Sequence, residues 1–324
     1  MKVLLCFPQQ DKQTGLYIRE ALEALEVQVH VFDPRAVQLR EAAPVLLRRV
    51  QEVKPEWVLS SREAYLAPSV CEVQKTCPFV VWSMDVRKDI AWWHPWMPLF
   101  RSADAFFTMA KGDVSKFRDL GIMRVFWLPE GCAPEHHRAI DPETLTPEER
   151  EFYSSEVSFC GAVDEFHDSS NLECGKRSVI LEAVGRAFRL KVWGASQGLP
   201  YARNDEHNKV IVCSSVHLGC SAFPEVEGSM SAREYRALGS GAILVTNRVK
   251  GIEAVLDSEV VRTYEDAEEC VALIAEALDE WHSDAVGMQR KREVIARYAY
   301  EQHSFRRRIV EMIEILKNER IISF

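Results

Sequence analysis

Short apolar, β-rich runs alternate with segments of helical periodicity along most of the chain. Lys2–Phe7 is the first such run, and Gly15–Leu25 follows it with leucine and isoleucine at helical spacing. Further strand-like runs in the first half are Val27–Phe32, Pro55–Leu59, Phe79–Trp82, Ala105–Thr108 and Arg124–Leu128. Strands that alternate with helices favour a parallel, doubly wound sheet.

A polar stretch, Asp141–Glu149, interrupts this pattern with prolines and acidic residues and is the best linker candidate. The alternation then restarts, with strand-like runs at Val157–Cys160, Leu190–Trp193, Val210–Cys213, Ala242–Thr246 and Val260–Tyr264. Helical segments are expected at Lys176–Phe188, Ser231–Leu238, Ala267–Trp281, Val286–Ala299 and Phe305–Lys317. We therefore predict two Rossmann-like domains, 1–145 and 150–324, that face each other across a cleft. The terminal helices are counted in the second domain and are expected to pack back.

Composition fits this architecture. A chain of 324 residues suits two domains of about 150 residues each. No apolar run approaches the roughly 20 residues of a membrane span, and the N-terminal one is too short for a signal peptide. The 9 cysteines form no C-x-x-C pair, which indicates reduced thiols and a cytoplasmic protein without a clustered metal site. A net charge of −9 disfavours general nucleic-acid binding but leaves room for a local basic groove.

Candidate binding residues follow the strands of the second half, because ligands of doubly wound sheets bind at the carboxyl ends of the strands. Gly161 ends one strand, and Arg177 opens the next helix, where it could pair with a phosphate. Ser231 starts another helix and would place free N–H groups near an anion. Asn247 ends the following strand, and Glu253 comes soon after it. A plain helix–turn–strand unit is the alternative interpretation.

In order along the chain, these segments resemble the CgeB-like (spore-maturation type) glycosyltransferases, which have the two-domain glycosyltransferase-B (GT-B) fold. The matching pieces of the second half are Val157–Gly161, Arg177, Val192–Gly194, Asn208–Val210, Ser231–Ala242, Thr246–Asn247, Gly251, Val261–Tyr264 and Tyr300–Arg308. In the first half, Trp82–Asp85, Ala103–Thr108 and Leu128–Gly131 are similar.

The resemblance implies a site for a nucleotide diphosphate-sugar, with a UDP-sugar favoured. The residues that it assigns to this donor site are Gly161, Arg177, Lys209, Ser231, Arg233 and Gly241. It implies no metal and no other cofactor, because positive side chains and helix N-termini neutralise the diphosphate in this fold. Where many relatives have a glutamate for the ribose hydroxyls, this chain has Arg236, which cannot accept hydrogen bonds. Either Glu234 or Glu253 then takes that role, or the donor is held differently.

The first half is expected to bind the acceptor. Asp85 follows a buried strand and is the leading candidate for the general base, with a helix cap as the alternative. His136 is a second catalytic candidate. Asp11 and Gly15 form another loop after the first strand. Three clustered tryptophans suggest an aromatic platform for a sugar or a base, with core packing as the alternative; they are Trp92, Trp93 and Trp96.

The sequence thus predicts a metal-independent glycosyltransferase that moves a hexose from a nucleotide sugar to a hydroxyl acceptor. A sharper version acts on hydroxymethylated bases in DNA. A sugar-nucleotide epimerase and a non-catalytic nucleotide-sugar binding protein are the alternatives. A Rossmann dehydrogenase is disfavoured, since no G-x-G-x-x-G follows the first strand.

Overall fold

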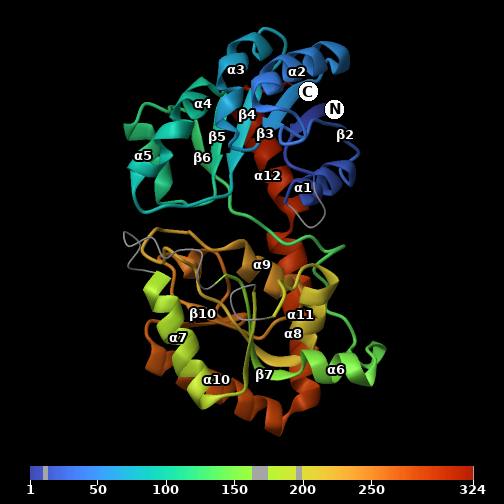
Figure 1. The fold of residues 1–324 in the computed structure, drawn as a ribbon, viewed down its shortest axis with the longest axis vertical. Coiled ribbons are helices and arrows are strands. Elements are labelled where there is room, and N and C mark those ends of the chain that lie inside the picture. The colour runs from blue at the N-terminus through green and yellow to red at the C-terminus, as the bar shows by residue number, and fades with distance from the viewer. Residues whose placement is uncertain (10–13, 163–173, 195–198, 324) are drawn as a thin grey trace. The chain divides into compact units, whose positions relative to one another are not determined.

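The computed structural model describes residues 1–9, 14–162, 174–194 and 199–323, and these residues divide into two compact units (Figure 1). The first unit contains Met1–Glu130, the short segment Val226–Ser229 and the chain from Phe305 onward. The second contains Gly131–Glu225 and Met230–Ser304. Each unit has its own sheet and its own core.

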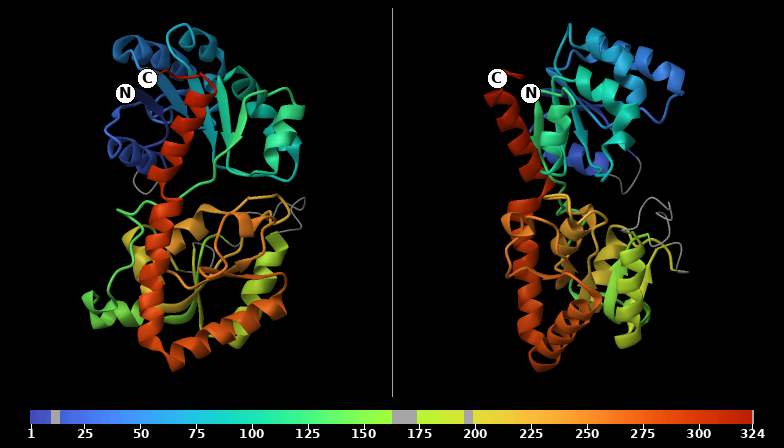
Figure 2. Two further views of the ribbon diagram at one scale, coloured as in Figure 1. Left: turned by 180° about the vertical axis from the view of Figure 1, so that it is seen from behind. Right: turned by 90° about the vertical axis from the view of Figure 1, so that its left-hand side faces the viewer.

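The first unit is built on six parallel strands in the order β2-β1-β3-β4-β5-β6. The strands are β1 (Lys2–Cys6), β2 (Gln28–Val31), β3 (Trp57–Ser60), β4 (Phe79–Ser83), β5 (Ala105–Thr108) and β6 (Val125–Trp127). The helices are α1 (Thr14–Glu23), α2 (Leu39–Val53), α3 (Ala67–Val73), α4 (Met97–Ser102), α5 (Asp113–Asp119) and α12 (Phe305–Asn318). Helices α2, α3 and α4 lie together on one face of the sheet, and α1 lies beside α12 on the other (Figure 2).

The second unit has five parallel strands in the order β11-β10-β9-β7-β8. They are β7 (Ser155–Cys160), β8 (Leu190–Trp193), β9 (Ser214–Leu218), β10 (Leu244–Asn247) and β11 (Val261–Tyr264). The helices are α6 (Pro147–Tyr153), α7 (Cys174–Ala187), α8 (Asp205–Val212), α9 (Ala232–Gly239), α10 (Ala267–Ser283) and α11 (Ala285–His303). Helices α7 and α10 pack together, as do α9 and α11.

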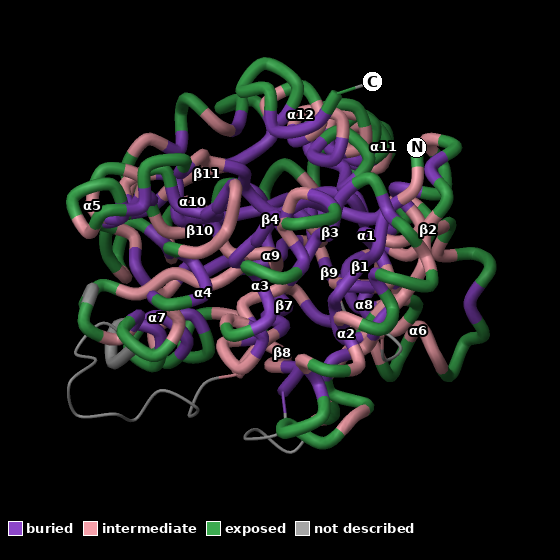
Figure 3. Tube along the Cα trace, turned by 90° about the horizontal axis from the view of Figure 1, so that it is seen from above, coloured by how far each residue is buried: buried purple, intermediate pink, exposed green. Residues whose placement is uncertain are grey.

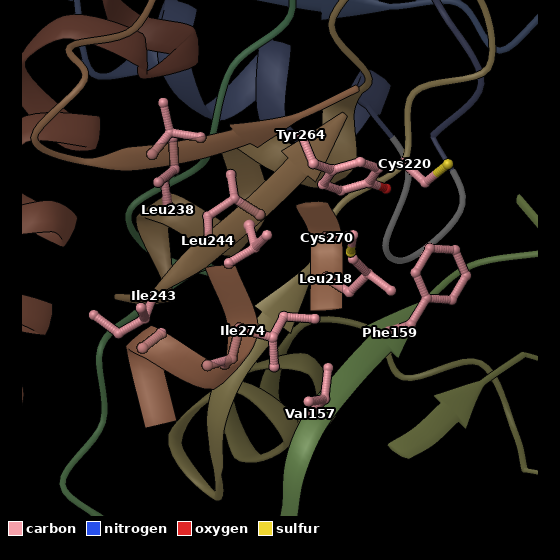
Figure 4. Close-up of a cluster of buried hydrophobic side chains, with 14 of the residues drawn as sticks. Val157, Phe159, Leu218, Cys220, Leu238, Ile243, Leu244, Tyr264, Cys270 and Ile274 are labelled. Carbon is pink, nitrogen blue, oxygen red and sulfur yellow. The ribbon is translucent and has the colours of Figure 1, made fainter. Parts of the chain in front are cut away.

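The central strands of both sheets are buried along most of their length and are coloured accordingly in Figure 3. Burial on both faces explains why they are near-continuous apolar runs. In the second unit, side chains from β7, β9, β10 and β11 meet those of α10 in one core (Figure 4). Two doubly wound parallel sheets confirm the predicted fold class.

The division between the units differs from the expected boundaries of 145 and 150. The break falls after Glu130, and α12 belongs to the first unit instead of packing on the second. Its buried residues recur at helical spacing and form one apolar stripe; they are Phe305, Ile309, Met312 and Leu316. Within the first unit, the Phe305 ring lies 5.8 Å from Tyr17 and 6.1 Å from Trp82. That buried contact, which the sequence does not reveal, fixes the helix to the first sheet.

One predicted strand is wrong. Val210–Cys213 belongs mostly to α8, and the strand β9 begins only at Ser214. A short apolar run does not distinguish a buried helix from a strand, because both bury most of their side chains. Here Val210 and Ile211 are the buried residues of the last helical turn.

No helix in the described part of the chain combines the length and the apolar character that a bilayer crossing requires.

Candidate donor site

Two arginines meet at the carboxyl ends of β7 and β9, within the second unit. The Arg177 side chain, on α7, donates from Nη1 to the Ala162 carbonyl at 2.6 Å and from Nη2 to the Cys220 carbonyl at 2.9 Å. Arg233, on α9, donates from Nη2 to the same Cys220 carbonyl at 3.2 Å. Their guanidinium carbons lie 5.8 and 5.6 Å from the centre of the Phe159 ring. Two positive charges therefore share one carbonyl and one aromatic ring.

These charges have no anionic partner in the described part of the chain, where no ion pair is formed by Arg177 or Arg233. Arg177 is only 3% exposed. Burial, together with the nearby charge of Arg177, lowers the pKa of Arg233 to about 10. Glu234 is the nearest acid in sequence, but its Oε1 accepts from the hydroxyls of Ser221 and Thr246 at 3.1 and 3.4 Å. A buried charge such as that of Arg177 is costly without a partner, so two adjacent guanidinium groups without a carboxylate are chemically suited to an anion.

The absence of a side chain at Gly161 leaves room for the guanidinium group of Arg233. A Cβ atom at position 161 would lie 2.1 Å from Nη1 of Arg233 and 3.2 Å from its Cζ. The amide of Gly161 donates to the Trp193 carbonyl at 2.9 Å. Gly194 follows directly, and a Cβ there would lie 2.3 Å from the Gly161 carbonyl oxygen. Close approach of these backbones thus requires small residues at both strand ends.

The loop that carries the Cys220 carbonyl is fixed by three polar side chains. Asn247, at the end of β10, accepts from the Ser221 amide at 2.7 Å and donates to the Ser221 carbonyl at 2.9 Å. The Ser221 hydroxyl in turn accepts from the Ser231 amide at 3.1 Å. Ser231 is the N-cap of α9 and accepts from the Arg233 amide at 3.3 Å. Asn247 and Ser231 therefore position the arginine pair.

A cavity of about 650 Å³ adjoins this loop, at the carboxyl ends of β9, β10 and β11. Its apolar wall includes Val179, Ile180 and Ala267, while Asn247 and Glu265 contribute polar groups. Cys220 also lines it, so the cavity and the arginine pair are neighbours. Its volume and mixed lining are typical of small-molecule sites.

Three of the predicted donor residues lie apart from this cluster. Lys209, on α8, pairs with Glu149, on α6, at 2.6 Å. Because α8 precedes β9 and α6 precedes β7, this ion pair lies toward the amino ends of these strands. Gly241 also precedes its strand; its φ is 77°, and a Cβ there would lie 3.0 Å from the Arg292 carbonyl oxygen, which together indicate a structural turn. Glu253 pairs with Arg248 at 3.2 Å and is exposed.

In the first unit, Asp85 forms an ion pair with Arg62. The Arg62 guanidinium lies 4.9 Å from the Trp96 ring centre, and Trp96 stacks on Trp92 at 4.5 Å. Arg87 lies 4.3 Å from the same Trp92 ring. The rings of Trp92 and Trp96 are thus in contact with each other and with the two arginine side chains.

Trp93 is fully buried and packs on Phe100 and Phe117, as a core residue does. Gly15 permits a close turn, because a Cβ there would lie 2.1 Å from the Pro8 carbonyl oxygen. His136 belongs to the second unit, where its Nδ1 lies 3.4 Å from Nδ2 of Asn204. Asp11 lies outside the described residues.

Sequence reasoning missed the Cys220–Ser221 loop and Phe159. The loop follows β9, which the sequence placed several residues too early, so its position at a carboxyl end was hidden. The contribution of Cys220 is a backbone carbonyl, which no side-chain motif signals.

Comparison with known proteins bears on the fold and the class of the protein. Residues 176–314 match a family model described as glycosyl transferase-like. No curated protein matches the chain. Among solved structures, an α-glucosyltransferase in complex with UDP and a DNA containing an HMU base is similar, with a TM-score of 0.64 and 11% identity over 98% of this chain and 99% of that chain.

Two further structures are similar at the same level. HepE from Anabaena, in complex with UDP, has a TM-score of 0.60 and 11% identity over 98% of this chain and 100% of that chain. Sucrose-phosphate synthase from Thermosynechococcus elongatus has a TM-score of 0.62 and 9% identity over 98% and 99%. At such identities the likeness establishes the fold, which is GT-B. The fold and the matching domain together define the class of protein: the chain is a glycosyltransferase. Its CgeB-like character stays a prediction.

Proposed function

We propose that this glycosyltransferase moves a hexose from a UDP-sugar to a hydroxyl acceptor, and that Arg177 and Arg233 hold the donor diphosphate. The observation that carries the proposal is the pair of guanidinium groups, of which that of Arg177 is buried and that of Arg233 half-buried, that share the Cys220 carbonyl without a carboxylate partner in the described part of the chain. A diphosphate would supply the missing negative charge through bidentate, charge-assisted hydrogen bonds.

The same pair would assist the chemistry. Cleavage of the glycosyl–phosphate bond leaves negative charge on the departing diphosphate, and preorganised positive groups in a water-poor site stabilise that charge most. Arg177 and Arg233 are already oriented by the Cys220 loop, so little reorganisation would be needed. We propose that these two positive charges are enough to stabilise the departing diphosphate, so that the transfer needs no metal ion.

The neighbouring cavity is proposed to take the nucleoside. HepE and the α-glucosyltransferase, which share the fold, were solved with UDP, which favours uridine. Glu234 is buried beneath the Cys220 loop, and Glu253 is exposed and does not line the cavity, so neither suits the ribose hydroxyls. Glu265 lines the cavity, where it pairs with Arg248 at 3.3 Å, and we assign it as the hydrogen-bond acceptor for the ribose hydroxyls, a role that Arg236 cannot fill.

Asp85 is proposed as the general base that takes the proton of the acceptor hydroxyl. Its carboxylate forms an ion pair with Arg62. The acceptor itself is defined only as a hydroxyl compound. Hydroxymethylated DNA is a second candidate because of the DNA-bound structure with the same fold, although the net charge of −9 opposes it.

A thermal-shift panel with UDP, GDP, ADP, CDP and dTDP tests the donor assignment. A nucleotide at about a hundred times its dissociation constant stabilises the folded state by roughly 2.7 kcal/mol. We expect UDP to give the largest shift and Arg177→Ala to abolish it. Arg186→Ala is the matched control, since Arg186 lies on the same helix α7 and is exposed. Equal shifts in both variants, or no shift with any nucleotide, would refute the donor site.

The fate of the sugar separates transfer from the alternatives. Incubation of the UDP-sugar with pooled hydroxyl acceptors, including hydroxymethylated DNA, is expected to release UDP and form a glycoside. A changed sugar still attached to UDP would indicate an epimerase, and an unchanged donor that still binds would indicate a binding protein.

A further inference from the structure

Behind the candidate donor site, the second unit contains a cluster of three potential metal ligands. They come from the end of β7, from α8 and from β9, and are Cys160, His207 and His217. One ligand atom of each residue lies within 4.8 Å of the others. The side chains are buried, with exposed fractions of 6%, 6% and 3%. This cluster is independent of the proposed function.

The hydroxyl groups beside Nδ1 of His217 suit a tautomer with the proton on that nitrogen. The Ser214 hydroxyl can donate to the Val210 carbonyl at 2.9 Å. Ser158, 2.7 Å from Ser214, can then donate to Ser214. In that arrangement the Ser158 oxygen accepts from Nδ1–H of His217 at 2.9 Å. The lone pair of His217 is then on Nε2.

His207 is arranged in the same way. The Ser240 hydroxyl can donate to Oδ1 of Asn208 at 2.8 Å or to the Arg236 carbonyl at 3.0 Å. When it does so, it accepts from Nδ1–H of His207 at 3.3 Å. The lone pair of His207 is then also on Nε2. Neither Nε2 atom has a hydrogen-bond partner in the described part of the chain.

This arrangement is the one that metal-binding histidines adopt, with Nδ1–H held by a second group and Nε2 directed to the ion. Cys160 would bind as its thiolate, and a metal ion would displace the thiol proton.

We propose that Cys160, His207 and His217 bind a d10 cation, Zn²⁺ or Cu⁺, through one sulfur and two Nε2 atoms. Ligands at about 2.0–2.3 Å from one ion lie roughly 3.5 Å apart, so a side-chain adjustment of about 1 Å closes the site. Thiolate and imidazole ligands select these ions over Mg²⁺ or Ca²⁺. With a thiolate, Cu⁺ leaves the site neutral, whereas Zn²⁺ leaves one positive charge near Arg233 and Arg236. The ion would join β7, β9 and α8.

Metal analysis of the untagged full chain tests this proposal. Protein from zinc- or copper-supplemented cultures should retain about one equivalent of one of these metals after desalting. Cys160→Ala and His217→Gln should each lower that content about tenfold or more. Cys270→Ala is the control, because Cys270 is a fully buried cysteine of the same unit that does not belong to the cluster.

Cobalt substitution gives a second readout, which tests the site in the wild-type protein itself. Wild-type protein freed of metal should develop a sulfur-to-cobalt charge-transfer band with CoCl₂, and Cys270→Ala should show the same band. A wild-type chain that holds less than about a tenth of an equivalent of zinc and copper, and that gives no such band, would overturn the proposal. Equal metal content in Cys160→Ala and wild type would also overturn it.

Discussion

The substitution Gly161→Ala should weaken UDP binding because it displaces the side chain of Arg233. The new methyl group would lie 2.1 Å from Nη1 of Arg233, whereas unstrained contacts need about 3.5 Å. The guanidinium must therefore move by about 1 Å or more, which exceeds the tolerance of a hydrogen bond. The φ of Gly161 is 159°, which L side chains rarely adopt, so the methyl group also strains the backbone. The atoms that it displaces are the end of a flexible side chain, so we expect the fold to survive.

The size of the effect follows from the bonds that are lost. A charge-assisted hydrogen bond contributes about 1.5–3 kcal/mol, which corresponds to a roughly 10- to 150-fold weaker Kd. Arg233→Ala removes the same bonds and should give a loss in the same range. The double variant should bind UDP no more weakly than Arg233→Ala alone, so the two changes are non-additive by about 1.5–3 kcal/mol.

Isothermal titration calorimetry with UDP on the four proteins of this cycle measures the coupling. Gly185→Ala is the matched control, because the nearest atom to a new Cβ there is 3.7 Å away, and UDP affinity should not change. Additive losses in the double variant would refute the reasoning, since Gly161 would then act on binding by a route other than Arg233.

Three further substitutions separate binding, catalysis and folding. Lys209→Ala should change the Kd of UDP less than about twofold, because Lys209 pairs with Glu149 away from the arginine pair; a tenfold loss by calorimetry would contradict this. Asp85→Asn should keep UDP affinity but slow transfer by about 10²–10⁴-fold in a UDP-release assay, and normal turnover would remove Asp85 as the base. Gly241→Ala should lower the free energy of unfolding by about 1–2 kcal/mol, since its φ is 77°; denaturant unfolding without a change would show that the turn adapts.

Strand content and parallel pairing could be predicted from the sequence because buried strands such as Phe79–Ser83 are continuous apolar runs. The position of α12 could not. Its apolar stripe shows that the helix is buried, but periodicity does not say which sheet buries it. The run Val210–Cys213 was assigned to a strand for a related reason, since burial alone does not set the backbone conformation.

The candidate site was predictable in part. Arg177 was named from its place after a strand and Arg233 only from the family resemblance, and the structure brings them together on the Cys220 carbonyl. Lys209 was also named, but its ion pair with Glu149 joins residues 60 positions apart, which no local pattern reveals. The hydrogen-bond chains beside His207 and His217 depend on four different segments, β7, α8, β9 and the end of α9, and no local pattern in the sequence reveals them.

The location of a bound diphosphate tests the central claim most directly. A crystal structure of the protein with UDP should place diphosphate oxygens within about 3.2 Å of the guanidinium groups of both Arg177 and Arg233. The nucleoside should lie in the cavity lined by Val179 and Glu265. A diphosphate bound elsewhere, with the arginine pair still on the Cys220 carbonyl and contacting no phosphate, would contradict the account.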